Sequence, residues 1–213
     1  MSPPVATVAS RRGAGARRRA AARRRAALLA ATAALVAIGA AVLMPLFRRA
    51  VNEFALPLAY SDVIRQQAAE KHLDPALIAA VIYTETKFDA RSSAAGAEGL
   101  MQIMPQTAEY LAHRSGATTF HVSDLATPQV NIAYGSYYLR YLLAEYKGSE
   151  TLALAAYNGG ESNVARWVAS ERAEGHQLTI SEIPFPETRA YVTRVLQAQR
   201  DYRNTYPQQL GYG

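Results

Sequence analysis

The sequence of 213 residues contains no cysteine, which excludes disulfide bonds, thiolate catalysis and thiolate metal ligands. The absence of cysteine does not decide the compartment, because a domain of this size can be stable without disulfides. Strand-like runs are also scarce, and residues 177–180 are the only candidate. Helical periodicity is therefore the organising signal, and we expect a mainly α fold.

Acidic residues are missing from the N-terminal part of the chain. None occurs before Glu53, whereas ten arginines lie within the first 49 positions. Residues 51–213 carry 13 basic and 17 acidic residues, a net charge of −4. The overall charge of +6 therefore belongs to the N-terminus and does not indicate that the folded part binds nucleic acid. Beside an apolar run, the arginine clusters suit topology signals and contact with anionic lipid.

That apolar run covers residues 26–47, about 22 residues, which is long enough to cross a bilayer as one helix. The preceding arginines predict a cytoplasmic N-terminus and a translocated remainder. A cleaved signal peptide and a buried core helix are the alternatives, and the long basic leader favours a retained anchor. We expect five segments: a disordered basic tail at 1–25, a transmembrane anchor at 26–47, a linker at 48–60, a helical domain at 61–205 and a C-terminal tail at 206–213.

Within the helical domain, capping residues and apolar spacing predict the helices. Asp74 is a suitable N-cap before Pro75 at the first helical position, and Ser61 and Ser149 are suitable caps of two other helices. The predicted helices cover residues 61–71, 74–87, 105–113, 128–147, 150–157, a segment around 164–168, and 188–202.

Glu85 is the most informative acidic residue. It follows Val81 and Ile82 by four and three positions, which places its carboxylate on the apolar stripe of the helix. Buried carboxylates are rare without a partner or a purpose, and burial raises their pKa toward the range of a general acid. The alternative is the solvated end of a helix whose stripe position is accidental. Gly96 and Gly99 in the next loop permit a sharp turn that could bring Ser93 and Gln102 beside Glu85.

Several separate motifs occur in one order along the chain. They are ETKF at 85–88, the loop at 93–99, LMQIMPQTA at 100–108, NIAYG at 131–135, ALAAYNGG at 153–160 and IPFPETRAYV at 183–192. Together they resemble the soluble lytic transglycosylase (SLT) domain family, over about residues 60–205. The resemblance implies a lysozyme-like helical fold and a bacterial enzyme on the cell-wall side of the membrane. It also implies cleavage of the MurNAc–GlcNAc β-1,4 bond of peptidoglycan with formation of a 1,6-anhydromuramoyl end.

The resemblance also implies the site residues. Glu85 matches the single catalytic acid and base of the family. The implied substrate-binding residues are Ser93, Met101, Gln102, Tyr157, Asn158 and Tyr191. The chain departs from the family at Thr86, where serine is usual, and at Gly159, where alanine is usual. The loop between Glu85 and Gly96 is about one residue shorter than the common pattern, which bears on the placement of Ser93.

The implied reaction needs no metal or cofactor, and the four histidines show no ligand spacing, so we expect them to be surface or packing residues. Two rival functions stay open: a goose-type lysozyme-like hydrolase, and a non-catalytic peptidoglycan-binding scaffold. Structural roles are the alternatives for individual residues. Glu98 suits an exposed loop position, Glu187 a helix cap, and Trp167 the core. Tyr157 and Tyr191 taken alone suit core positions, and Asn158 taken alone suits a helix C-cap.

Overall fold

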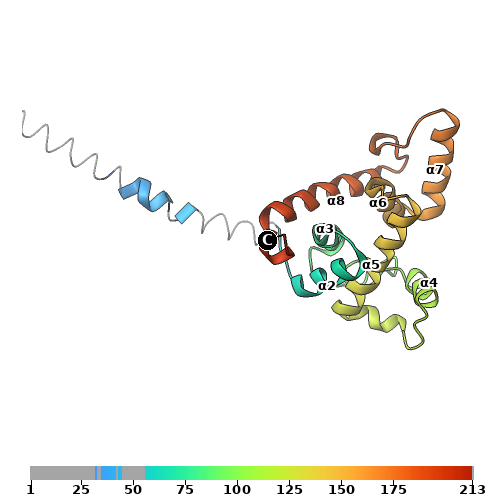
Figure 1. Ribbon diagram of the computed structural model, residues 1–213, viewed down its shortest axis with the longest axis horizontal. Coiled ribbons are helices and arrows are strands. Elements are labelled where there is room, and N and C mark those ends of the chain that lie inside the picture. Colours follow the sequence, from blue (N-terminus) through green and yellow to red (C-terminus); the bar gives the residue numbers. More distant parts are fainter. Residues whose placement is uncertain (1–31, 33–34, 42, 45–55, 213) are drawn as a thin grey trace, which may run out of the picture. The chain divides into compact units, whose positions relative to one another are not determined.

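The computed structural model describes residues 32, 35–41, 43–44 and 56–212 (Figure 1). The chain divides into two units, Met1–Asn52 and Glu53–Gly213. In the first unit, the described residues are helical. Within the described part of the chain, no helix combines the length and the apolar character needed to cross a membrane. The predicted tail at 1–25, much of the predicted anchor and most of the linker lie outside the described residues.

The second unit is helical, as predicted. The helices are α2 (Ser61–Lys71), α3 (Pro75–Thr86), α4 (Pro105–Ser115), α5 (Pro128–Glu145), α6 (Glu150–Gly159), α7 (Glu161–Ala173), α8 (Pro186–Thr205) and α9 (Pro207–Leu210), with 3₁₀ turns η1 (Val122–Ala126) and η2 (Ile180–Glu182). Over residues 56–212, the strand-type pairing is one isolated bridge, between Glu98 and Ile103. The predicted strand at 177–180 is wrong, because residues 177–179 form a loop that leads into η2.

Two of the three predicted caps are confirmed. The Asp74 carboxylate accepts the Ala76 N–H at 2.9 Å, and the Ser149 hydroxyl accepts the Leu152 N–H at 3.3 Å. The prediction of Ser61 as a cap is wrong. The capping position of α2 is Tyr60, whose backbone is left-handed with φ of 55°, and no side chain caps this helix.

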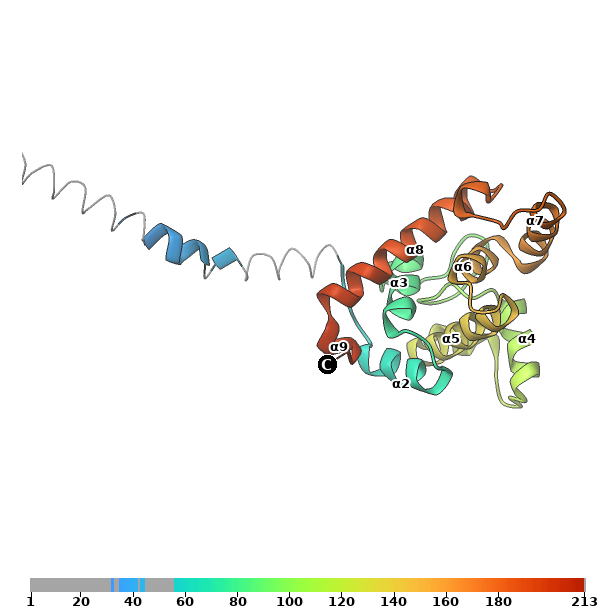
Figure 2. The same ribbon diagram turned by 45° about the horizontal axis from the view of Figure 1, so that its top comes forward.

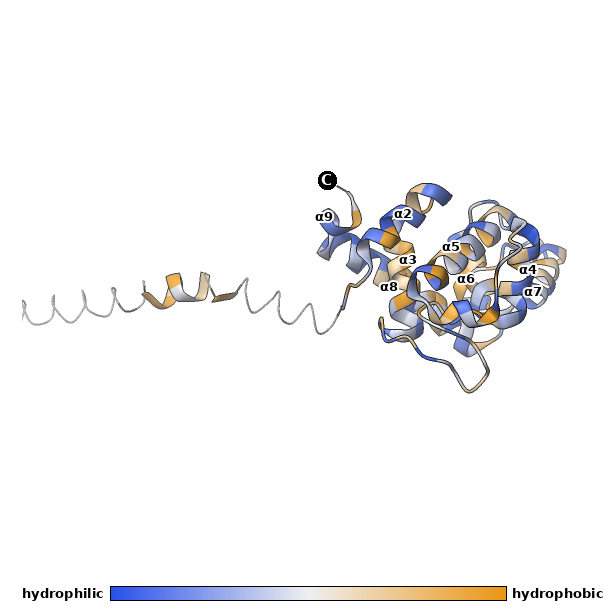
Figure 3. Cartoon of the chain, turned by 90° about the horizontal axis from the view of Figure 1, so that it is seen from below, coloured by the Kyte–Doolittle hydropathy of each residue, from blue (hydrophilic) through white to orange (hydrophobic). Residues whose placement is uncertain are grey.

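Helix α3 is the centre of the fold. It packs extensively against α8 and also against α2 (Figure 2). Every residue from Ala76 to Ile82 is buried, and the hydropathy colouring shows a concentration of apolar residues along this helix (Figure 3). A helix that is apolar on all sides belongs inside a domain. The sequence predicted one apolar stripe on this helix. In the structure, neighbouring elements cover all of its faces from Ala76 to Ile82.

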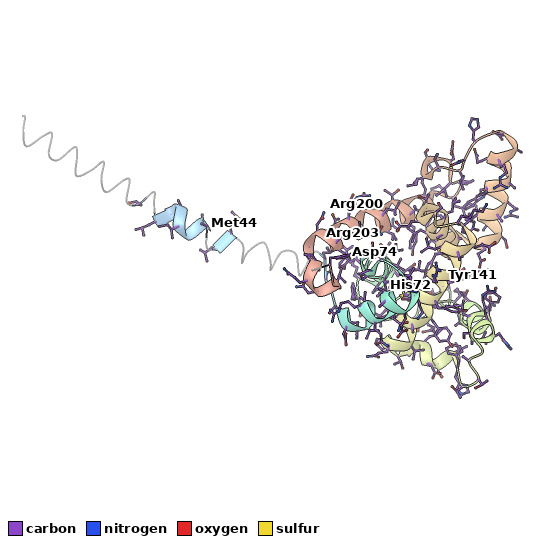
Figure 4. All side chains as sticks on the ribbon, viewed as in Figure 1. Met44, His72, Asp74, Tyr141, Arg200 and Arg203 are labelled. Carbon is purple, nitrogen blue, oxygen red and sulfur yellow. The ribbon has the colours of Figure 1, made fainter. Side chains whose placement is uncertain are left out.

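Helix α8 holds the first described residues of the second unit and the start of α3. The hydroxyl groups of Tyr202 and Tyr206 donate to the carbonyls of Pro57 and Leu56, at 2.5 and 2.8 Å. At the start of α3, Asp74 accepts hydrogen bonds from Gln199 and Arg203 of α8 (Figure 4). Residues 206–212, expected as a tail, include α9, whose Leu210 is buried. The bonds to Asp74 fix the N-terminal end of α3 against α8.

Candidate active site

Glu85 lies in the last turn of α3, where the buried helix emerges from the core. The helix stops at Lys87, which adopts a left-handed backbone and donates its N–H to the Tyr83 carbonyl at 2.9 Å. Beside Glu85, the buried hydroxyl of Thr86 donates to the carbonyls of Ile82 and Leu100, at 3.1 and 2.8 Å. The hydroxyl at position 86 thus joins the end of α3 to the loop that follows, and it lies close to the candidate acid.

The loop between α3 and α4 is closed by its own hydrogen bonds. Glu98 and Ile103 exchange two backbone bonds, of 2.9 and 3.0 Å. Ser93 stabilises the tighter turn, because its hydroxyl accepts the Ala97 N–H at 2.9 Å. Gly99 has φ of 74°, and a side chain there would collide with Asn131. Ser93 is therefore placed as a turn-forming residue of this loop.

Gln102 adopts a left-handed backbone with φ of 48°, which is costly for a residue with a side chain. Its amide nitrogen donates to the carbonyls of Arg91 and Gly99, at 2.7 and 2.8 Å. These bonds offset the backbone strain and hold both arms of the loop together. The side chain that the resemblance assigns to substrate binding also has this structural role.

Asn131, at the start of α5, forms hydrogen bonds with the backbone of the same loop. Its buried amide donates to the carbonyls of Glu98 and Leu125, at 2.8 and 3.0 Å, and accepts the Met101 N–H at 2.8 Å. The Met101 side chain is fully buried and lies against Gly135, where an added methyl group would collide with its sulfur. Met101 therefore presents its backbone to the site.

Two tyrosines from other helices complete the surroundings of Glu85. Tyr157 of α6 donates its hydroxyl to the Met101 carbonyl at 2.8 Å. Tyr191 of α8 is buried, with 2% of its surface exposed, and its hydroxyl makes no hydrogen bond of normal geometry in the described structure. It is nevertheless close enough to Glu85 for each group to change the pKa of the other. Burial and the charge of Glu85 raise the pKa of both tyrosines well above the ordinary value, so both are neutral donors at physiological pH.

Burial raises the pKa of Glu85 from the ordinary 4.5 to about 7. Two groups partly offset the loss of water, namely the nearby Tyr191 hydroxyl and the positive charge of Arg194. Loss of solvent stabilises the neutral carboxylic acid, whereas a donor and a cation stabilise the carboxylate. The balance gives a group that is protonated in a large fraction of molecules at neutral pH and can also ionise there.

Arg194 was not foreseen from the sequence. It is exposed and follows Tyr191 by three positions on α8, the spacing that places two residues on one helix face. This spacing could have indicated that Arg194 lies near Glu85, but only if the packing of α8 on α3 were already known. Among the described residues, Arg194 forms no ion pair. Its charge therefore acts on Glu85 at a distance.

We expect an Arg194→Gln variant to raise the pKa of Glu85 further. Its positive charge favours the ionised carboxylate, so its removal favours the protonated acid. If the reaction needs protonated Glu85, the alkaline limb of the kcat/KM profile will move to higher pH. Arg200→Gln, the same change at another exposed position on α8, is the control and should leave the limb in place, because Arg200 is not among the groups that influence Glu85. An unchanged or lowered limb in Arg194→Gln would contradict this electrostatic account.

The other candidates have different surroundings. Asn158 is exposed in the last turn of α6, next to Tyr157. Glu98 is partly buried and accepts the Ser92 hydroxyl at 2.6 Å. Glu187 is exposed in the first turn of α8. Trp167 is half-buried and packs edge-on against Phe185, with ring centroids 4.9 Å apart. Among the described residues, no three histidine, aspartate or glutamate side chains form a group that could hold a metal ion.

Comparison with known proteins shows strong similarity to one family. The model of the family described as "Transglycosylase SLT domain" matches residues 62–180. The soluble lytic murein transglycosylase of Salmonella typhimurium is 32% identical over 155 residues, which are 71% of this chain and 24% of that protein. The membrane-bound lytic murein transglycosylase C of Edwardsiella ictaluri is 29% identical over 166 residues, 68% of this chain and 46% of that protein.

Solved structures give the same result for the fold. An inactive Glu-to-Gln mutant of the lytic transglycosylase Slt from Pseudomonas aeruginosa matches with a TM-score of 0.66 and 30% identity, over 73% of this chain and 26% of that one. A 70 kDa soluble lytic transglycosylase in complex with bulgecin A matches with a TM-score of 0.65 and 32% identity, over 71% and 25%. The chain thus spans about a quarter of the length of these proteins.

Proposed function

The chain belongs to the transglycosylase SLT domain family, and from this membership and the surroundings of Glu85 we propose that it is a peptidoglycan lytic transglycosylase. The proposed reaction cleaves the β-1,4 bond between MurNAc and GlcNAc and leaves a 1,6-anhydro-MurNAc end. The observation that carries the proposal is the largely dry carboxyl group of Glu85, which has a pKa of about 7 and lies close enough to Tyr157 and Tyr191 to raise the pKa of both.

In the proposed mechanism, Glu85 acts first as an acid and then as a base. Its proton passes to the glycosidic oxygen as the bond from that oxygen to C1 of MurNAc breaks, and positive charge develops at C1. The Glu85 carboxylate then takes the proton of the C6 hydroxyl of the same sugar. The C6 oxygen forms the new bond to C1, so no water is consumed. An attacker within the same molecule has a high effective concentration, of order 10⁵ M or more in favourable cases.

Among the described residues, no second carboxylate acts on Glu85, and this favours the route above over hydrolysis. Hydrolysing glycosidases usually need two carboxyl groups, separated by roughly 5 to 10 Å. A second carboxylate at that separation would raise the pKa of Glu85 by charge repulsion. In the described part of the chain, the groups that influence Glu85 are Tyr191 and Arg194, and no carboxylate is among them.

Ser93, Met101, Gln102, Tyr157, Asn158 and Tyr191 are proposed as the residues that shape the glycan site. Tyr157 and Tyr191 are the best supported, because each interacts electrostatically with Glu85. The neutral Tyr191 hydroxyl can donate to the carboxylate or to a sugar oxygen, whereas the Tyr157 hydroxyl already donates to the Met101 carbonyl and can accept from a sugar hydroxyl. Ser93, Gln102 and the backbone of Met101 position the loop that borders them, and exposed Asn158 is free to contact a sugar.

The mass of the products tests the proposal. Purified chain is incubated with sacculi, and the released muropeptides are analysed by mass spectrometry. We expect anhydro products, which have no reducing end and are lighter than the hydrolysis products by one water. Hydrated products with reducing ends would support the lysozyme-like hydrolase instead. Intact sacculi with bound protein would support the non-catalytic scaffold.

We also propose that residues 26–47 anchor the chain in the membrane, with the catalytic unit on the cell-wall side. The support is the uncharged apolar run behind the arginine clusters, and a relative is named as membrane-bound. We expect the full chain to stay in the membrane pellet after alkaline carbonate extraction, and a variant lacking residues 1–47 to become soluble. Recovery of a shortened chain outside the membrane fraction would instead indicate a cleaved signal peptide.

A further inference from the structure

A row of tyrosine rings leads away from Glu85. Its first member is Tyr157, and Tyr138 of α5 packs against that ring with the centroids 5.2 Å apart. Tyr141, one helical turn further along α5, stacks on Tyr138 at 6.3 Å. Tyr110 of α4 packs edge-on against Tyr141 at 5.9 Å. The row thus joins three helices through successive ring contacts.

Glu161 fixes the middle of the row. It is the first residue of α7, where a negative charge is favourable. Its two carboxylate oxygens accept the hydroxyl groups of Tyr138 and Tyr141, at 3.3 and 2.9 Å. Its backbone carbonyl accepts the Tyr146 hydroxyl at 3.5 Å. Because each carboxylate oxygen has its own donor, the two rings are held in one orientation and are not free to rotate away.

The outer end of the row is open to solvent. Tyr110 is 45% exposed although its neighbours hold it in place. The Arg114 guanidinium lies 4.8 Å from the centre of the Tyr141 ring and donates to the Tyr110 hydroxyl at 3.4 Å. An exposed ring is common on protein surfaces. Here, however, neighbouring groups hold the ring in place, and ring contacts lead from it through Tyr141 and buried Tyr138 to Tyr157.

We propose that the exposed outer end of this row is part of a glycan-binding track supported by buried Tyr138, and that Tyr110 contacts a saccharide unit of a strand whose scissile bond lies at Glu85. The inference rests on the proposed function. A glycan fits because its sugar rings present C–H faces that pack on aromatic rings, while their hydroxyl groups bond to polar groups at the ring edges. Tyrosine hydroxyls and the Arg114 guanidinium supply those polar groups. A rigid aromatic contact also loses little conformational entropy on binding.

The test measures binding in the full chain carrying Glu85→Gln, so that strands are not cleaved. The ligands are long glycan strands from purified peptidoglycan and a single disaccharide unit, and calorimetry gives the affinity for each. Adding Tyr110→Ala should weaken binding of the long strands about tenfold and leave the disaccharide unaffected. Tyr110→Phe should retain most of the affinity for long strands, because the ring remains.

Glu109→Ala, at the adjacent exposed position of α4, is the matched control and should bind both ligands like the parent. If Tyr110→Ala binds long strands as tightly as the parent, or loses affinity for both ligands equally, the track is refuted. If the parent binds neither ligand and the wild type leaves sacculi intact, the proposed function fails as well. A thermal melting curve for each variant shows whether it is still folded, and so whether a loss of affinity is caused by unfolding.

Discussion

A Glu85→Gln variant is expected to lose turnover of peptidoglycan by about 10³-fold or more, because one side chain supplies both proton transfers. Glutamine has nearly the same size and keeps a polar side chain beside Tyr191, but it cannot give up a proton to the leaving oxygen. The measurement is the initial rate of muropeptide release from sacculi. Glu98→Gln, which neutralises the carboxyl group of the neighbouring loop, is the control and should stay active.

The same variant should be more stable than the wild type at alkaline pH. A folded-state pKa that burial has raised from 4.5 to about 7 means that the ionised form is destabilising. That cost is fully present above pH 7 and absent below the unfolded value of 4.5. It amounts to on the order of 3 kcal/mol. Glu85→Gln should therefore raise Tm at pH 8.5 and change it little at pH 4. Loss of activity together with lower stability at both values would mean that the substitution damages the fold.

An Asn131→Ala variant is expected to lose about 3–5 kcal/mol of folding free energy. The change removes one buried amide and leaves two backbone groups without that partner, the Met101 N–H and the Leu125 carbonyl, whereas the Glu98 carbonyl keeps only the bond from the Ile103 N–H. Each unsatisfied buried group costs about 1–3 kcal/mol, and the whole domain has only about 5–15 kcal/mol. The loop that carries Met101 should therefore loosen even where the rest of the fold survives.

Urea unfolding at fixed pH measures this effect. Asn158→Ala is the matched control, because it removes the same side chain from an exposed position at the end of α6, and it should cost less than about 0.5 kcal/mol. A loss below about 1 kcal/mol in Asn131→Ala would show that the amide is not the support described above.

Local chemistry made part of this structure predictable from the sequence. The Asp74–Pro75 start of α3 and the Ser149 start of α6 depend on side chains that bond within a few residues, so they could be read directly. The position of Glu85 was also predicted, although for an incomplete reason. Its helix is buried on every side, which depends on packing by α2 and α8 and not on one apolar stripe.

Contacts between distant parts of the chain could not be predicted. The influence of Arg194 on Glu85 exists only because α8 lies against α3. The bonds from Glu161 to Tyr138 and Tyr141 require α7 to begin beside α5. The predicted cap at Ser61 was wrong because Tyr60 takes a left-handed backbone before the helix, and the loop at 177–179 has strand-like composition but no neighbouring strand to pair with.

The most direct test of the central claim is the titration of Glu85 itself. With ¹³C-labelled glutamate, the carboxyl carbon of Glu85 can be assigned by its absence in Glu85→Gln and followed by NMR over pH 3–9. The account predicts a midpoint near 7, well separated from the exposed glutamates. A midpoint near 4.5, the ordinary value for this side chain, would contradict it, because Glu85 would then be fully ionised at neutral pH and unable to serve as the acid.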